Sequence, residues 1–197
     1  MTARQRALKR VIDVVGSAVG LVVTSPVLAA AAVAIKLEDG GPVLFRQGRP
    51  GLAGTLFDVY KLRTMTVGEH RGGVDAGDAR ITRVGRLLRA TSIDELPQLA
   101  NVLRGEMSLV GPRPTLAEQM AKYTPEQARR MDVQPGLTGW AQIHGRSSIP
   151  WSRRLELDVW YVDHQSLALD LKILKGTIGV LLRRGQVYRT SGGGFDL

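Results

Sequence analysis

The sequence predicts an α+β protein that is mainly helical and is attached to a membrane by its N-terminal segment. Three observations carry this prediction. Residues 14–35 contain no charge, short β-rich runs flank residues 47–54, and apolar residues recur at helical spacing from 167 to 181. We expect a re-entrant membrane helix over residues 1–36, a cytoplasmic domain with interfacial helices over 37–187, and a flexible tail over 188–197.

The uncharged segment has Ser25-Pro26 at its centre and basic residues on its N-terminal side. Because a long basic region follows it, both of its ends prefer the cytoplasmic side of a membrane. Proline disrupts a helix, so we expect a re-entrant helix broken at Ser25-Pro26, with two arms of roughly 16 Å each. A hydroxyl of Ser25 or Thr24 would bond the carbonyl that the proline leaves free. An ordinary kinked span is the alternative.

Residues 43–45 and 56–60 are short β-rich runs, and the glycine-rich residues 47–54 between them predict a hairpin-like loop. Four basic residues give this small unit positive charge: Arg46, Arg49, Lys61 and Arg63. Such a unit is often only a solvated face. Next to a membrane segment it also suits anionic headgroups or a phosphorylated substrate. Residues 66–80 are polar and predict a mobile loop.

The adjacent acids Asp94 and Glu95 stand in the middle of an arginine-rich stretch over residues 86–114. Ser92 and Glu95 fit a helix capping box. A helix that begins at Asp94 or Glu95 is the alternative, because it keeps Pro97 in the first turn, where proline is tolerated. Asp94 would then lie beside free N–H groups, which attract phosphate. Both interpretations stay open on spacing alone.

Arg113 lies between Pro112 and Pro114, so its backbone is stiff. A pre-ordered arginine suits bidentate phosphate binding, although a rigid connector with an exposed arginine has the same sequence. Further on we expect a helix to about residue 131 and a loop over 134–140. A basic amphipathic helix follows, with an apolar stripe made of Leu167, Leu171, Leu174, Ile178 and Leu181. This stripe suits a membrane interface or the protein's own core.

Composition narrows the chemistry. The chain has 27 Lys and Arg against 18 Asp and Glu, which indicates an anionic partner. It has no cysteine, and its three histidines are scattered, which argues against Cys or His metal sites. Paired acids suit Mg²⁺, and an aspartate can also act as a nucleophile toward phosphorus. These features indicate phosphoryl chemistry at a membrane, with a nucleic-acid binder or a non-catalytic lipid-phosphate-binding scaffold as alternatives.

Four segments, 57–65, 91–99, 107–114 and 134–140, resemble the bacterial sugar transferase family, and in particular its small monotopic polyprenyl-phosphate phosphoglycosyl transferases. The resemblance implies transfer of a sugar phosphate from a UDP-sugar to undecaprenyl phosphate at the inner leaflet of the plasma membrane. The products would be undecaprenyl-diphosphate-sugar and UMP. It implies no nucleic-acid partner, does not identify the sugar, and leaves open whether the protein forms a homodimer.

The resemblance also implies roles for individual residues. Asp94 matches the nucleophile, which would form a covalent phosphosugar intermediate, and Glu95 would assist it as a proton acceptor or in placing Mg²⁺. Ser25 and Pro26 match the family's helix-breaking pair. The residues that match phosphate-binding positions are Lys61, Arg89, Arg113 and Arg146.

Overall fold

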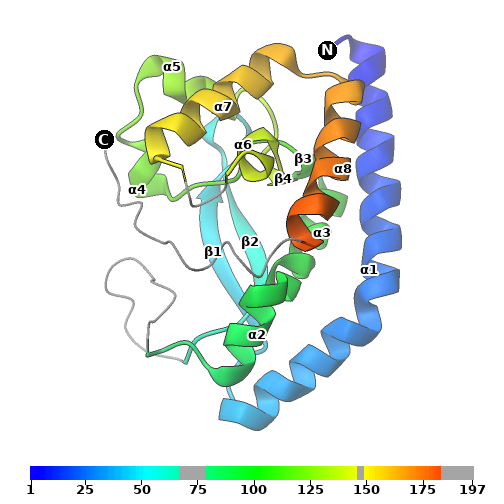
Figure 1. Cartoon of the computed structure of the whole chain (residues 1–197), viewed down its shortest axis with the longest axis vertical. Helices are drawn as coiled ribbons and strands as arrows, with labels where there is room; N and C mark the ends of the chain where they lie inside the picture. Colours follow the sequence, from blue (N-terminus) through cyan, green and yellow to red (C-terminus); the bar gives the residue numbers. More distant parts are fainter. Residues whose placement is uncertain (67–78, 146–148, 183–197) are drawn as a thin grey trace.

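One long helix, α1 (Ala3–Asp39), runs along a whole side of the molecule, and the other elements lie on one side of it (Figure 1). The structure is a computed structural model that describes residues 1–66, 79–145 and 149–182. Most of the predicted mobile loop, Arg146 and the predicted tail lie outside these residues. α1 is long and apolar enough to cross a membrane, and only 11% of its apolar window is buried by the rest of the described protein.

Pro26 lies inside α1, which bends part-way along its length but remains one helix (Figure 1). The expected break into two separate arms is therefore wrong. Without an N–H, Pro26 leaves the carbonyl of Val22 without its usual helical donor. The hydroxyl of Ser25 donates to that carbonyl oxygen at 2.8 Å. This confirms the prediction that a neighbouring hydroxyl compensates for the proline, and it explains how the helix stays continuous.

The predicted hairpin is present, but its strands are longer than expected. β1 (Leu44–Pro50) pairs antiparallel with β2 (Leu56–Leu62), and Arg49 lies opposite Phe57. Half of the predicted loop over 47–54 therefore belongs to β1, and the connection between the strands contains a short 3₁₀ helix, η1 (Leu52–Gly54). The prediction missed the second half of β1 because its side chains are polar. Pairing with β2 satisfies the backbone hydrogen bonds of these residues, whatever their side chains are.

The arginine-rich stretch forms three short helices: α2 (Arg83–Thr91), the 3₁₀ helix η2 (Ile93–Gln98) and α3 (Leu99–Arg104). Ser92 adopts a left-handed conformation, with φ of 55°, and its side chain caps nothing. The capping-box interpretation is therefore wrong. Asp94 and Glu95 lie in the first turn of η2, and Pro97 lies within it. Gly105 ends α3 with a positive φ of 82°, which favours glycine.

A parallel pair of short strands was not predicted. β3 (Ser108–Val110) lies beside β4 (Gly136–Thr138), inside the predicted loop over 134–140. The pairing continues past β3, because the N–H of Gly111 donates to Thr138 and that of Gly136 to Pro112, at 2.9 and 2.8 Å. A Cβ on Gly111 would lie 2.3 Å from the carbonyl oxygen of Gln134, so only glycine fits this approach. The ladder fixes the backbone just before Arg113.

The C-terminal part is helical. Its elements are α4 (Ala117–Met120), α5 (Pro125–Ala128), the 3₁₀ helix η3 (Arg129–Met131), α6 (Trp140–Ile143), α7 (Trp151–His164) and α8 (Leu167–Leu182). α8 buries Ile173 completely, whereas Leu171 and Ile178 of the predicted stripe are 52% and 61% exposed. The core-packing interpretation is therefore wrong for these two residues. The interfacial role of α8 stays a prediction.

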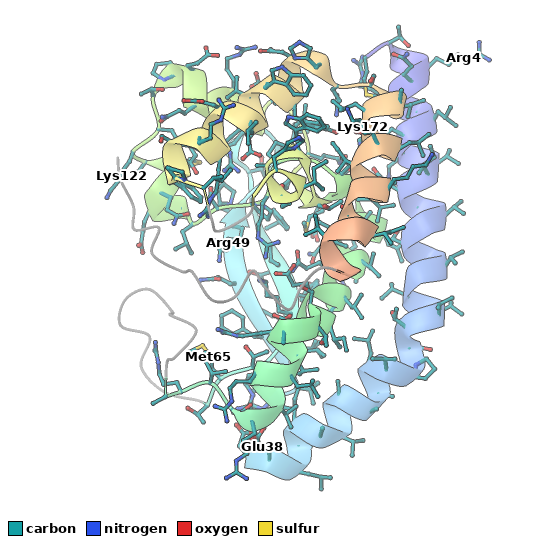
Figure 2. The ribbon with its side chains drawn as sticks, viewed as in Figure 1. Arg4, Glu38, Arg49, Met65, Lys122 and Lys172 are labelled. Atoms are coloured by element: carbon teal, nitrogen blue, oxygen red, sulfur yellow. The ribbon has the colours of Figure 1, made fainter. Side chains whose placement is uncertain are left out.

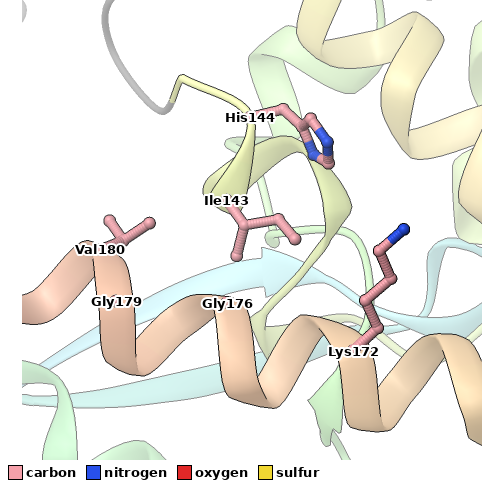
Figure 3. Close-up of a pocket in the computed structure, with 6 residues that line it drawn as sticks. All are labelled: Ile143, His144, Lys172, Gly176, Gly179 and Val180. Carbon is pink, nitrogen blue, oxygen red and sulfur yellow. The ribbon is translucent and has the colours of Figure 1, made fainter.

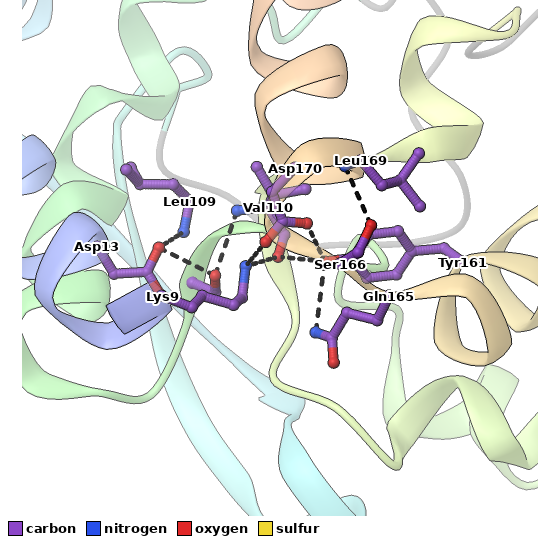
Figure 4. A network of polar contacts seen from close by, with 10 residues as sticks. Lys9, Asp13, Leu109, Val110, Tyr161, Gln165, Ser166, Leu169 and Asp170 are labelled. Atoms are coloured by element: carbon purple, nitrogen blue, oxygen red, sulfur yellow. Dashed lines mark hydrogen bonds and ion pairs between the residues drawn. The ribbon is translucent and has the colours of Figure 1, made fainter. Parts of the chain in front are cut away.

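The first half of α1 is bonded to the C-terminal part of the fold through buried charges (Figure 4). Lys9 Nζ lies 2.7 Å from a carboxylate oxygen of Asp170 and 3.0 Å from the carbonyl oxygen of Val110. One turn later, Asp13 accepts hydrogen bonds from the Ser108 hydroxyl and the Leu109 N–H, at 3.0 and 2.9 Å. These contacts join α1 to β3 and α8.

The other end of α1 is bonded to the hairpin and to α2. Arg63 forms a bidentate ion pair with Asp39, with one N–O distance of 2.7 Å. The carboxylate of Glu38 accepts the N–H groups of Arg83 and Val84 at the start of α2, at 2.7 and 3.0 Å. Glu38 lies at this lower end of the helix in Figure 2. Both ends of the apolar helix are thus attached to the same folded unit.

Candidate active site

Asp94 and Glu95 are neighbours in η2 but have different surroundings. Glu95 is bonded to Arg113 through both of its oxygens, with Arg113 Nη1 3.1 Å from Oε2, and Lys61 Nζ lies 3.3 Å from Oε1. Asp94 is only 8% exposed, and its carboxylate makes no hydrogen bond within the described part of the chain. The fold thus gives one acid two cationic partners and leaves the other acid free to react.

The charges around Glu95 hold it ionised. Burial acts to raise the pKa of Glu95, but the charges and hydrogen bonds of Arg113 and Lys61 outweigh it and hold that pKa far below its usual value. Burial lowers the pKa of Lys61, and Glu95 offsets only part of this effect. Glu95 is therefore a weak proton acceptor, and its main effect is to fix the positions of two cations.

Asp94 is shifted in the opposite direction. Burial, together with the negative charge of Glu95, raises the pKa of Asp94 from 3.8 to about 6, against the opposing charges of Lys61, Arg113 and Arg89. A carboxylate with a raised pKa is more basic and more nucleophilic than an ordinary one. At neutral pH Asp94 is mostly ionised, and cations that suit a phosphate surround it.

The structure brings together five of the six residues predicted for this site, and it leaves two nearby arginines elsewhere. Arg89 donates to the Thr64 hydroxyl at 2.8 Å, and its charge acts on Asp94. Arg146, the sixth residue, is not among the residues that the structure describes. Arg86 and Arg104 flank the acids in sequence, but their side chains bond the carbonyl of Ile81 and the hydroxyl of Tyr60 instead.

The support behind Arg113 was not predicted. Arg130 is buried and donates to the carbonyl oxygen of Arg113 at 2.7 Å and to the hydroxyl of Thr115 at 3.1 Å. It also forms a buried ion pair with Asp158 of α7, at 2.5 Å. Arg130 and Asp158 look like ordinary charges of amphipathic helices, so nothing in their sequence pattern marks them.

A divalent cation fits this site only with help from a substrate. No group of three or more His, Cys, Asp or Glu side chains that could hold a metal occurs in residues 1–66, 79–145 and 149–182. Both oxygens of Glu95 are bonded to cations, whereas those of Asp94 are bonded to none among the residues that the structure describes. Mg²⁺ often binds through one or two carboxylates plus substrate phosphates. Asp94 meets this requirement.

A separate cavity of about 330 Å³ lies between α6 and α8 (Figure 3). It is lined mainly by apolar residues and glycines, with His144 and Lys172 as its polar groups, and neither acid lines it. The reactive features therefore lie around η2, where the buried carboxylate of Asp94 has no hydrogen bond from the described part of the chain and lies in the field of several cations. This arrangement suits attack on a phosphorus atom whose oxygens need positive partners.

Comparison with known proteins identifies relatives along nearly the whole chain. Residues 4–184 match the family described as bacterial sugar transferase. The chain is 48% identical to the sugar transferase EpsL of Bacillus subtilis, with 93% of this chain and 92% of the relative covered. It is 49% identical to the UDP-glucose:undecaprenyl-phosphate glucose-1-phosphate transferase of Caulobacter vibrioides, over 91% of this chain and 72% of the relative. An undecaprenyl-phosphate N-acetylgalactosaminephosphotransferase of Aeromonas hydrophila is 40% identical over 89% of this chain and 44% of its own length.

Proposed function

Because this chain belongs to the bacterial sugar transferase family, we propose that it transfers a sugar phosphate from a UDP-sugar to undecaprenyl phosphate. The products are undecaprenyl-diphosphate-sugar and UMP. The named relatives use UDP-sugars and undecaprenyl phosphate, but they differ in the sugar, so the proposal leaves the sugar open. The observation that carries the proposal is the buried carboxylate of Asp94, which makes no hydrogen bond within the described residues and is acted on by the charges of Arg113, Lys61 and Arg89.

In the first step, a carboxylate oxygen of Asp94 attacks the phosphorus bonded to the sugar. The bond from this phosphorus to the oxygen that bridges the two phosphates breaks, and UMP leaves with that oxygen and its electron pair. A phosphosugar remains bound to Asp94 as an acyl phosphate. The raised pKa of Asp94 supports this role, because it makes the ionised oxygen a better nucleophile.

In the second step, an oxygen of undecaprenyl phosphate attacks the same phosphorus. The bond between phosphorus and the Asp94 oxygen breaks, which regenerates the carboxylate and releases undecaprenyl-diphosphate-sugar. Negative charge on the transferring phosphoryl oxygens has cationic partners in Arg113, Lys61 and Arg89. No proton transfer is required in either step, because both nucleophiles are ionised at neutral pH.

Glu95 is a positioning residue in this scheme. Its oxygens hold Arg113 and Lys61, and a pKa far below the usual value makes it a poor base. We therefore assign the proton-acceptor role to neither acid. Mg²⁺ would be held by Asp94 and substrate phosphates, and when bound it would neutralise phosphate charge.

The attachment of α1 supports a re-entrant topology. Lys9 and Asp13 bond one half of the helix to β3 and α8, and Glu38 and Asp39 bond the other end to α2 and the hairpin. A straight span would have to place one of these ends on the far side of a membrane from its partners. The helix therefore enters and leaves by the same leaflet, with the fold on the cytoplasmic face of the inner membrane.

UMP release tests the proposed function. The purified full chain is given Mg²⁺, undecaprenyl phosphate and a panel of UDP-sugars, and we expect the wild type to release UMP from at least one donor. Asp94→Asn removes the nucleophile and should abolish release, whereas a lipid-phosphate-binding scaffold would be unaffected by this change. Absence of UMP from every donor with the wild type would refute the enzyme proposal.

A further inference from the structure

Arg49 is a half-buried cation of the hairpin that the site described so far does not use. It lies on β1, where its side chain shares a strand face with Gln47, because side chains alternate along a strand. Lys61 lies on the same face of the hairpin. It pairs with Phe45, which shares a face with Arg49 because the two residues are four positions apart on β1. Figure 2 shows Arg49 beside β1, near the middle of the view. The hairpin thus presents two cations on one face.

Arg49 has no acidic partner within residues 1–66, 79–145 and 149–182. Its one hydrogen bond there goes to the neutral amide oxygen of Gln47, at 2.6 Å. Burial, and then the positive charge of Arg113, lower the pKa of Arg49 to about 10. A guanidinium that is partly desolvated, close to a second guanidinium and without a carboxylate is unfavourable by itself, and an anion between the two would relieve it.

The strand register and the ion pairs of Glu95 bring Arg49 to the cationic side of the site. Arg49 and Lys61 share a face of the hairpin, and Lys61 bonds the same carboxylate as Arg113, that of Glu95. The positive charge of Arg113 also acts on both Asp94 and Arg49. A diphosphate whose sugar-bound phosphate lies at Asp94 and Arg113 would extend its second phosphate toward Arg49.

We propose that Arg49 binds the phosphate of the departing nucleoside monophosphate, while Arg113 is shared between the two phosphates of the donor. This inference rests on the proposed function and assigns a residue to the donor's leaving group. In the ground state Arg49 would hold the donor, and as the bridging bond breaks it would face the additional negative charge that UMP acquires. The acceptor phosphate has no place in this subsite.

The experiment compares Arg49→Met with Arg46→Met, a matched control on the opposite face of the same strand. Arg46 is exposed and lies 5.4 Å from the ring of Tyr60, outside the site. Steady-state UMP release gives KM for the UDP-sugar and for undecaprenyl phosphate, and product inhibition gives the inhibition constant of UMP. For Arg49→Met we expect the donor KM and the UMP inhibition constant to rise together by roughly 10- to 100-fold, as for loss of a charge-assisted hydrogen bond. The acceptor KM should stay unchanged, as should all constants of Arg46→Met.

A third variant separates binding from folding. Arg49→Lys keeps the charge and should retain part of the donor and UMP affinity. The inference is overturned if Arg49→Met behaves as Arg46→Met, or if only the acceptor KM rises. It is also overturned if Met and Lys lower the melting temperature alike and leave the UMP inhibition constant unchanged. Failure of the proposed function looks different, because the wild type itself would then release no UMP.

Discussion

Asp94→Asn should stabilise the protein while it abolishes activity, because the native fold buries a negative charge at a cost. The rise in the pKa of Asp94 from 3.8 to about 6 measures this cost. At ~1.4 kcal/mol per pKa unit, the folded state loses roughly 3 kcal/mol when the carboxylate is ionised. Asparagine has the same shape and no charge, so it avoids this loss.

The pH dependence of stability follows from the raised pKa of Asp94. Between pH 3.8 and about 6 the native state binds more protons at Asp94 than the unfolded state, so wild-type stability falls as the pH rises through this window. Asparagine has no such dependence. The advantage of Asp94→Asn should therefore be complete at pH 8 and close to zero at pH 4. For a chain of this size, about 3 kcal/mol corresponds to a melting temperature roughly 6 to 12 °C higher.

The assay is thermal unfolding of the detergent-solubilised wild type and variant at pH 8 and pH 4, without Mg²⁺ or substrate. Glu95→Gln is the matched control. It removes the neighbouring carboxylate, but it also takes the partner from Arg113 and Lys61, so we expect a lower melting temperature at pH 8. The reasoning fails if Asp94→Asn leaves the melting temperature unchanged at pH 8, or raises it equally at both pH values.

Three further predictions concern the rate, the support of Arg113 and the topology. UMP release should rise about tenfold per pH unit below pH 6 and level off above it, as Asp94 ionises; a flat profile from pH 5 to 8 would contradict its role. Arg130→Met should destabilise the fold by roughly 3–5 kcal/mol by leaving Asp158 buried and unpaired. The double variant Arg130→Met/Asp158→Leu leaves no buried charge unpaired, so its stability in chemical denaturation should return toward that of the wild type. Its KM for the UDP-sugar should stay raised, because the carbonyl of Arg113 still lacks the hydrogen bond from Arg130. A return of both stability and donor KM to wild-type values would show a purely structural role. Single cysteines at Ala7 and Lys36, in a chain that has none of its own, should react with a membrane-impermeant thiol reagent from the same side; labelling from opposite sides would refute the re-entrant topology.

Sequence patterns predicted those features that depend on neighbouring residues. Pro26 and the Ser25 hydroxyl lie next to each other, so the compensating hydrogen bond follows from local chemistry. The capping box failed at Ser92 because α2 ends there with a left-handed turn, which a pattern of four residues does not reveal.

The site itself was only partly visible in the sequence. Asp94 and Glu95 stood out because they are adjacent in the sequence. Their different surroundings depend on distant residues: Lys61, 34 residues before Glu95, and Arg113, 18 residues after it, both bond Glu95. The β3–β4 ladder escaped notice because each strand has three residues and its partner is distant. Parallel pairing of this kind depends on tertiary contacts that no local period records.

The two attachments of α1 differ in when they become available during synthesis. Asp39 meets Arg63 after 24 further residues, and Glu38 meets the start of α2 after 45, so the C-terminal end is secured early. Lys9 must wait for Asp170, which is made 161 residues later. A growing chain therefore gains the attachment at Glu38 and Asp39 first and the contacts of Asp13 with Ser108 and Leu109 next, whereas Lys9 has no acidic partner until Asp170 is made. A chain truncated before Asp170 would keep the early attachment and lose the late one. α8 thus completes the attachment of α1 to the fold.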